Sequence, residues 1–244
     1  MVQWGTPILS LAVLVLIWWA VTAVFSLPAY ILPTPLKVLD SIIGTGPVLW
    51  TNLETTFLET IEGFIVAVIV GVAASLLIAS SKVAERLIYP ILVTTQAVPK
   101  VAVAPIFLAW FGLGSEPRIV IAGLLAVFPI IINTSVGLIG VDPGLLMLAR
   151  STGAKRHRVF WQVRLPAALP GFFAGLKLGI ALAVVGAVVG EFVGGDTGLG
   201  YIVTYAQGNL NTSLAFAAIV LLSVLGVALF YIIDGIEKLF VHWS

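Results

Sequence analysis

The chain has 244 residues, of which 60% are apolar and 9% are charged, and its formal net charge is +1 at pH 7. Soluble domains carry about 25% charged residues, so this composition excludes a soluble globular protein and indicates an apolar surface covered by membrane lipid. The near-neutral charge argues against nucleic acid as a partner, and the absence of cysteine excludes disulfides and thiolate metal sites.

Six apolar stretches approach or exceed the roughly 20 residues that a helix needs to cross a bilayer. They cover residues 7–25, 55–80, 87–111, 119–139, 167–193 and 214–240. Pro99 and Pro105 interrupt the third stretch. No lysine or arginine precedes the first stretch, which argues against a cleaved signal peptide. We therefore predict an all-α, polytopic membrane protein with about six transmembrane helices.

The distribution of lysine and arginine predicts the orientation, because cytoplasmic loops are enriched in these residues. With the N-terminus inside, eight of the twelve cations are cytoplasmic: Lys82, Arg86, Arg150, Lys155, Arg156, Arg158, Arg164 and Lys238. Lys37 and Arg118 fall outside, while Lys100 and Lys177 lie within predicted spans. We predict a multi-pass protein with both termini in the cytoplasm.

The loop between the fourth and fifth spans holds five of the twelve lysines and arginines. Asp142 supplies an N-cap side chain, and Pro143 is a residue favoured at the first helical position, so a helix is predicted to begin there. The helix is predicted to end at Gly153, because glycine most easily adopts the left-handed turn that closes a helix.

A second short helix is predicted after Gly153, with Val159, Phe160 and Val163 on one face and cations largely on the others. It is expected to end near Pro166. The pair of helices would lie along the cytoplasmic membrane surface. Its cations either bind anionic lipid headgroups, at about 1 kcal/mol each, or serve a more specific contact.

The spacing in this loop resembles that of the membrane-spanning permease subunits of binding-protein-dependent ABC importers. Their loop carries Glu-Ala-Ala, three residues, Gly, nine residues, Ile or Val, one residue and Leu-Pro. The matching positions here are Ala149, Arg150, Ser151, Thr152, Gly153, Val163, Arg164, Leu165 and Pro166. Met147 and Leu148 stand where the family has Glu and Ala, so an ion pair made by that Glu has no counterpart here.

The resemblance covers roughly residues 52–243, and segments 98–114, 128–146 and 190–203 are similar to the nitrate, sulfonate, taurine and thiamine-precursor branch. It implies an N-terminal transmembrane helix with an outer segment in residues 1–50 and a permease transmembrane domain in residues 51–244, as a single domain overall. The implied function is an inner-membrane translocation pathway for a small organic anion or a heteroaromatic nutrient.

The resemblance also implies three protein partners. These are an ATP-binding subunit in two copies, a second permease subunit that makes a homodimer, and a substrate-binding protein. The loop would be the coupling helix that contacts the ATP-binding subunit, through Ala149, Arg150, Ser151, Gly153, Ala154, Arg158, Val163, Leu165 and Pro166. No Gly-x-x-x-x-Gly-Lys-Ser/Thr loop is present, so we expect no enzyme and no cofactor in this chain, with ATP and Mg bound by the partner.

The fifth span repeats small residues at intervals of four, which places them on one helical face. The two trios are Gly171, Gly175 and Gly179, then Gly186, Gly190 and Gly194. Small residues allow the close helix contact that holds membrane helices together. The face packs either within one subunit or against a second subunit, and the family resemblance favours the second.

Three polar residues in the spans are candidates for the substrate pathway, because charge at membrane depth is costly. Lys100 is either a pathway cation or a partner for carbonyls freed by Pro99 and Pro105. Glu191 precedes a glycine-rich outer loop, where it serves gating, docking of the binding protein or only solvation of a helix end. Asn133 is either a pathway hydrogen-bonder or an interhelical contact.

Two other classes of protein are less well supported. A secondary transporter driven by an ion gradient calls for inverted repeats and paired acidic residues at mid-membrane, and neither is apparent. A membrane enzyme or scaffold has no supporting constellation of His, Asp and Ser. His157 and His242 are far apart in sequence, which argues against a metal site.

Overall fold

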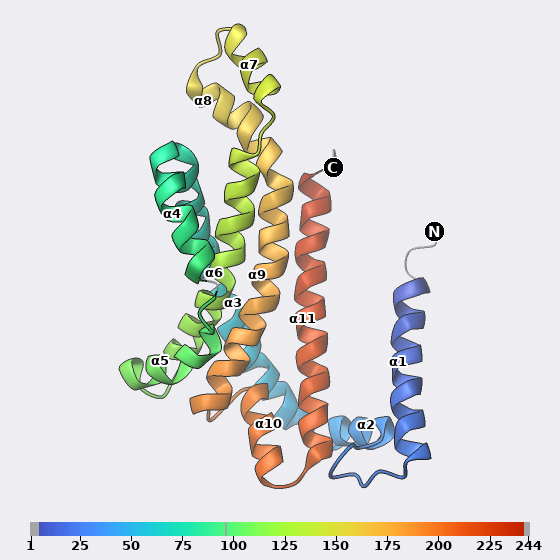
Figure 1. The fold of residues 1–244 in the computed structure, drawn as a ribbon. Coiled ribbons are helices and arrows are strands. Elements are labelled where there is room, and N and C mark those ends of the chain that lie inside the picture. Colours follow the sequence, from blue (N-terminus) through green and yellow to red (C-terminus); the bar gives the residue numbers. More distant parts are fainter. Residues whose placement is uncertain (1–4, 96, 242–244) are drawn as a thin grey trace.

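The computed structural model describes residues 5–95 and 97–241, a part of the chain that is mainly helical and contains no β-strand (Figure 1). The helices are α1 (Gly5–Val24), α2 (Pro35–Gly44), α3 (Gly46–Ser80), α4 (Lys82–Thr95), α5 (Ala104–Phe111), α6 (Ser115–Ile139), α7 (Pro143–Ser151), α8 (Arg156–Val159), α9 (Leu165–Gly194), α10 (Leu199–Gly208) and α11 (Thr212–Phe240). A 3-10 turn, η1 (Lys100–Val103), precedes α5, and a π turn, η2 (Phe160–Arg164), joins α8 to α9. The predicted all-α class is confirmed.

Four helices in the described residues are long and apolar enough to cross a membrane: α3, α6, the continuous helix His157–Gly194 and α11. They correspond to the second, fourth, fifth and sixth predicted spans. α3 begins at Gly46 rather than near Thr55, so the predicted division between residues 50 and 51 falls inside this helix.

The third predicted span is not one straight helix. α4 and the segment Lys100–Phe111 meet at an angle of 82°, as in a broken span or a re-entrant loop. Pro99 directly precedes η1 and cannot donate a backbone N–H, which accounts for a break at this point. Pro105 is no interruption, because it lies in the first turn of α5, where proline is well tolerated.

The first predicted span corresponds to α1, which stands apart from the bundle of other long helices in Figure 1. This helix has 20 residues, Gly5–Val24, and is apolar along most of its length. Trp18 ties α1 to the rest of the chain. Its Nε1–H donates to the Pro33 carbonyl at 3.1 Å, and its ring centroid lies 5.8 Å from that of Phe216 on α11.

The core of the bundle is formed by α3, α6 and α9, which approach one another through small residues. A Cβ added to Gly63 of α3 would lie 2.7 Å from the Cβ of Ala122, and one added to Gly186 of α9 would lie 2.6 Å from the Cα of Ala122. Ala126 and Ile130 of α6 are fully buried in this contact. Close approach of this kind gives van der Waals packing where lipid removes the hydrophobic drive.

The glycine face predicted on the fifth span packs against α6 of the same chain. A Cβ on these residues would come within 2.6–3.1 Å of α6 atoms: Gly171, Gly175, Gly179, Gly186 and Gly190. Gly194 lies instead against Leu108 of α5. Packing within one subunit therefore accounts for this face, and a second subunit is not needed to explain it.

The bundle has two ends, which we call the α7 end and the α10 end. α7 and α8 project from the first, beyond the last turn of α11, and α2 and α10 lie at the second (Figure 1). α3 and α6 both begin at the α10 end, whereas α9 runs in the opposite direction, as the pairing of Gly171 with Asn133 and of Gly190 with Arg118 shows.

Candidate functional site

At the α7 end, the loop between α6 and α9 begins with a capped helix, as predicted. The Asp142 carboxylate accepts a hydrogen bond from the Gly144 N–H at 2.5 Å, which caps α7. Gly153 has a φ of 74°, and the Ala154 N–H reaches the Ala149 carbonyl at 3.3 Å. This pattern is a Schellman closure, in which the left-handed glycine turns the chain from α7 toward α8.

The second helix of this loop does not end near Pro166. α8 continues through η2 into α9, so that His157–Gly194 is one helix. An end was expected because proline lacks an N–H and its ring clashes with the carbonyl four residues earlier. In η2 the Leu165 N–H instead reaches the Phe160 carbonyl, and a wider turn of this kind accommodates the proline without breaking the helix.

α7 presents apolar side chains away from the bundle. Leu145, Met147 and Leu148 are 53%, 71% and 63% exposed. Met147 and Leu148 occupy the positions at which the resembling loop has Glu and Ala, so the contact offered here is apolar rather than ionic. An exposed apolar surface on a projecting element is typical of a contact with another protein.

The other predicted coupling residues lie along the same loop. Ser151 and Arg158 are exposed. The half-buried members are Ala149, Ala154, Val163, Leu165 and Pro166. The Arg150 side chain lies outside the described residues. A cavity of about 460 Å³ separates this loop from the last turns of α3, with Leu76 and Ser80 on one wall and Phe160 and Arg164 on the other.

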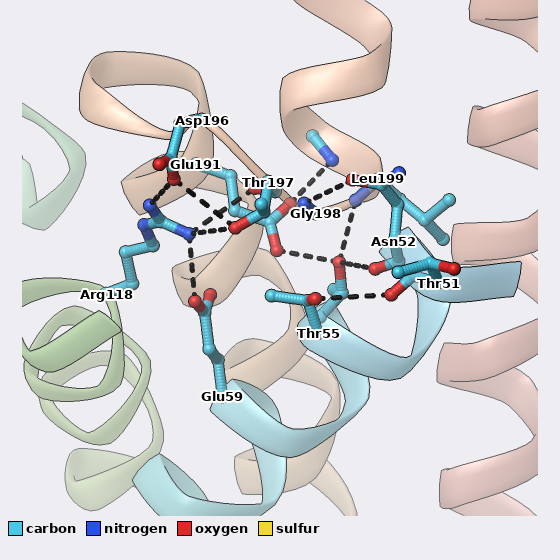
Figure 2. A network of polar contacts seen from close by, with 12 residues as sticks. Thr51, Asn52, Thr55, Glu59, Arg118, Glu191, Asp196, Thr197, Gly198 and Leu199 are labelled. Carbon is cyan, nitrogen blue, oxygen red and sulfur yellow. Dashed lines mark hydrogen bonds and ion pairs between the residues drawn. The ribbon is translucent and has the colours of Figure 1, made fainter. Parts of the chain in front are cut away.

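At the α10 end, Glu191 of α9 is 1% exposed and joins three elements (Figure 2). Its Oε1 accepts from the Thr56 hydroxyl of α3 at 2.7 Å, and its Oε2 accepts from the Gly200 N–H of α10 at 2.6 Å. The carboxylate therefore fixes the start of α10 against both α9 and α3.

Two further backbone N–H groups at the start of α10 are held by α3 (Figure 2). The Leu199 N–H donates to the Thr56 hydroxyl at 2.8 Å, and the Gly198 N–H donates to Asn52 Oδ1 at 2.7 Å. Gly198 has a φ of 101°, and a Cβ at this position would overlap the Glu191 carboxyl. Glycine is thus required by both the backbone conformation and the space.

Arg118 of α6 is the buried cation of this network, with a side chain that is 3% exposed (Figure 2). Its NH1 group donates to Glu59 Oε1 at 3.0 Å and to the Thr197 hydroxyl at 3.1 Å, and its NH2 group donates to Asp196 Oδ1 at 2.8 Å. The Asp196 side chain is 88% exposed. The hydrogen bond from Arg118 holds the pKa of this carboxyl below its ordinary value.

The structure does not bring the three predicted pathway residues together. The Lys100 ammonium lies 4.3 Å from the ring centroid of Phe128 on α6, and the Asn133 amide donates to the Pro129 carbonyl of its own helix at 2.9 Å. Glu191 belongs to the network at Arg118. Arg118 precedes Phe128 by ten residues on α6, a separation of about 15 Å at a rise of 1.5 Å per residue. Their roles in a pathway stay predictions.

Sequence reasoning missed two ionic clusters. One is Arg118 with Glu59, and the other is Lys177 of α9 with Asp234 and Glu237 of α11, where the Lys177–Asp234 distance is 3.1 Å. The available signal was a set of opposite charges within apolar spans, since a charge at membrane depth needs a partner. His242 lies outside the described residues. Within the described residues, no group of three metal-ligating side chains occurs.

Comparison with known proteins bears on these observations. Residues 63–242 match the profile of a family described as "Binding-protein-dependent transport system inner membrane component". A probable ABC transporter permease protein of Haemophilus influenzae is 36% identical, over 98% of this chain and 97% of its own. The riboflavin transport system permease protein of Chloroflexus aurantiacus is 35% identical, over 98% and 90% of the two chains.

A third relative, the formylaminopyrimidine transport permease protein of Halalkalibacterium halodurans, is 33% identical over 97% of this chain and 95% of its own. Among solved structures, an inward-facing form of the MetNI methionine ABC transporter contains a chain with a TM-score of 0.62 at 23% identity, covering 80% of this chain and 94% of that one. This last likeness shows a shared fold.

Proposed function

Because this chain belongs to the family of binding-protein-dependent transport system inner membrane components, we propose that two copies of it form the translocation pathway of an ATP-driven importer. The chain is the transport component of an ABC importer, and a separate subunit hydrolyses ATP. A substrate-binding protein delivers the solute, and two ATP-binding subunits, which hold ATP and Mg, drive the cycle.

In the proposed orientation, the α7 end faces the cytoplasm and the α10 end faces outward. The count of lysines and arginines supports this orientation, because eight lie at the α7 end and near the termini and two lie at the other side. Cytoplasmic loops are enriched in these residues. α7 and α8 project from the bundle there, where an ATP-binding subunit can reach them (Figure 1). Both chain termini are then cytoplasmic.

The observation that carries the proposal is the shape and chemistry of α7. It is a capped helix closed by a left-handed Gly153, and it exposes Leu145, Met147 and Leu148. A rigid helix with an apolar face can dock into a groove of another protein, which excludes water from both surfaces. The adjoining cavity of about 460 Å³ leaves room for this loop to move against α3.

The proposed substrate is a heteroaromatic nutrient or a small organic anion. Two relatives that match nearly the full chain are named for the transport of riboflavin and of formylaminopyrimidine, both heteroaromatic, and another is named for taurine. Lys100 above Phe128 offers a positive charge beside an aromatic face, a combination that suits either class.

The contact with the ATP-binding subunit is tested by Leu148→Asp. A carboxylate on this exposed apolar position should reduce co-purification of the ATP-binding subunit at least about tenfold, because the charge would have to be desolvated at the interface. The variant should still insert, since Leu148 is 63% exposed. Leu210→Asp is the matched control, at an 81% exposed leucine at the other end of the bundle, and it should leave co-purification unchanged.

Transport itself is measured with the complex in liposomes that contain ATP inside and are supplied with the cognate substrate-binding protein outside. Uptake of riboflavin, formylaminopyrimidine or taurine should require ATP and the binding protein. Uptake that proceeds without ATP and follows an ion gradient would show a secondary transporter instead and overturn the proposal.

A further inference from the structure

The network in Figure 2 connects the surface of the α10 end to the buried contact between α3 and α6 through one exposed side chain. Asp196 is 88% exposed, whereas the Arg118 and Glu59 side chains are 3% and 4% exposed. Within the described residues, Asp196 Oδ1 accepts from Arg118 and Thr197, and the carboxyl also interacts with its own backbone N–H. The exposed carboxylate can therefore accept a further hydrogen bond from outside.

The buried part of this network is short of hydrogen bonds. Among the described residues, Glu59 Oε2 and Arg118 Nε are both buried without a donor–acceptor partner, and these two atoms belong to the same ion pair. The Glu59 carboxyl also interacts with the carboxyl of Glu191. A buried polar atom without a partner costs about 1–3 kcal/mol. The arrangement seen here is thus incompletely paired at two atoms that could satisfy each other.

A second arrangement of the same residues would satisfy both atoms. The Nε–H and the NH2 group lie on one side of a guanidinium and form a fork that matches the two oxygens of a carboxylate. In the structure the NH2 group is held by Asp196 at 2.8 Å. If Asp196 withdraws, Arg118 can turn and donate to both oxygens of Glu59.

We propose that Asp196 is the contact for a cationic group on the substrate-binding protein, and that this contact moves Arg118 from its shared position to full pairing with Glu59. The inference rests on the proposed function, which supplies a partner at this end of the bundle. The partner's lysine or arginine would take over the Asp196 carboxylate that Arg118 now holds.

Docking at the exposed Asp196 would thus change the buried contact between α3 and α6. Thr197 also accepts from Arg118, so the loop at residues 195–197 would be released when Arg118 turns. The start of α10 would stay in place, because Gly198, Leu199 and Gly200 are held by Asn52, Thr56 and Glu191. Only the pairing of α6 with α3 and this short loop would change.

The test compares Asp196→Asn with the unaltered complex of permease and ATP-binding subunit, using the cognate substrate-binding protein as the probe. Removing the charge should weaken docking at least about fivefold in low salt, and the difference should shrink as salt is added. Arg118 should also be free to pair with Glu59 without a partner, so hydrolysis of ATP in the absence of binding protein should rise at least twofold.

Glu116→Gln is the matched control, because Glu116 is an exposed carboxylate at the start of α6 that makes no ion pair in the described residues. It should leave both docking and basal hydrolysis unchanged. Asp196→Glu keeps the negative charge and should therefore dock the binding protein as the unaltered complex does. Unchanged docking by Asp196→Asn, or an equal loss in Glu116→Gln, would overturn the inference while transport by the unaltered complex kept the proposed function intact.

Discussion

At the scale of single residues, the charges inside the spans divide into paired and unpaired groups. Arg118, in the first turn of α6, and Lys177, within α9, each contact two acids. Lys100 differs, because among the described residues its ammonium forms no ion pair and lies 4.3 Å from the ring centroid of Phe128. An ionisable side chain in an apolar segment of a membrane protein is a candidate for contact with a solute.

Lys100→Met tests this role. Methionine keeps the length and the apolar stem of the side chain and removes the charge, so that packing is largely preserved. The complex should assemble with its ATP-binding subunit and keep basal hydrolysis, while uptake of an anionic substrate should fall at least about tenfold. Uptake by proteoliposomes and the melting temperature of the complex are the measurements.

Lys37→Met is the control for this substitution, since Lys37 is an exposed cation on α2 outside the core of the bundle. It should leave uptake unchanged. Early melting of the Lys100→Met complex would assign the residue to the fold, and normal uptake by a stable complex would exclude both roles.

The residues that sequence could predict are those governed by their immediate neighbours. Asp142 and Gly153 follow from the chemistry of helix ends, which involves only a few adjacent residues. Arg118 and Glu59 are 59 residues apart and meet only because α3 and α6 pack side by side. No local rule contains that information, so the network at the α10 end appears only in the structure.

At the scale of elements, hydropathy located the ends of α6 and α11 within a few residues, because their lipid-facing turns are apolar. It missed the early start of α3 at Gly46, because the first turns of this helix carry polar residues. Prolines were harder to interpret. Pro99 accompanies a break, Pro105 begins α5, and Pro166 lies within a continuous helix. The outcome depends on whether a neighbouring turn can widen or restart, which the proline itself does not determine.

The bend between α7 and α8 gives a prediction for one element. No atom lies within 4 Å of a Cβ built on Gly153, so a substitution there is opposed only by the φ of 74°. Gly153→Val should strain this left-handed turn by about 1–2 kcal/mol, while Gly153→Asn should be tolerated because asparagine adopts such conformations more readily. Both variants should insert in the membrane.

Hydrolysis of ATP stimulated by the substrate and its binding protein measures the effect. Gly153→Val should lose most of the stimulation, and Gly153→Asn should keep most of it. Full stimulation in the valine variant would mean that this bend takes no part in coupling.

At the scale of the whole molecule, the all-α class followed from composition, but the arrangement of the helices did not. About six spans were predicted, whereas the described residues contain four helices long and apolar enough to span, or five if the bent pair is one span. The position of α1 apart from the bundle, the bent third span and the contact of α9 with α6 through glycines all depend on packing. The division at residues 50 and 51 and the homodimer stay predictions.

The orientation gives a prediction for the whole molecule, since the described chain contains no cysteine. Single cysteines at Lys155, in the loop after α7, and at Gln207, in α10, should react with a membrane-impermeant thiol reagent from opposite sides. Gln207 is chosen because it is exposed, whereas Asp196 is engaged by Arg118. Reaction of both positions from the same side would contradict the proposed topology.

The unbroken passage of α8 through η2 into α9 makes one rod of 38 residues, His157–Gly194. At 1.5 Å per residue the rod is roughly 57 Å long, so a tilt of about 5° around one end displaces the other by about 5 Å. One end carries the loop beside α7 and the other carries Glu191, which holds the start of α10. A tilt of this rod would carry a movement of the loop beside α7 to the Glu191 end, and the wide turn at η2, close to the α7 end, is the place where the rod can flex.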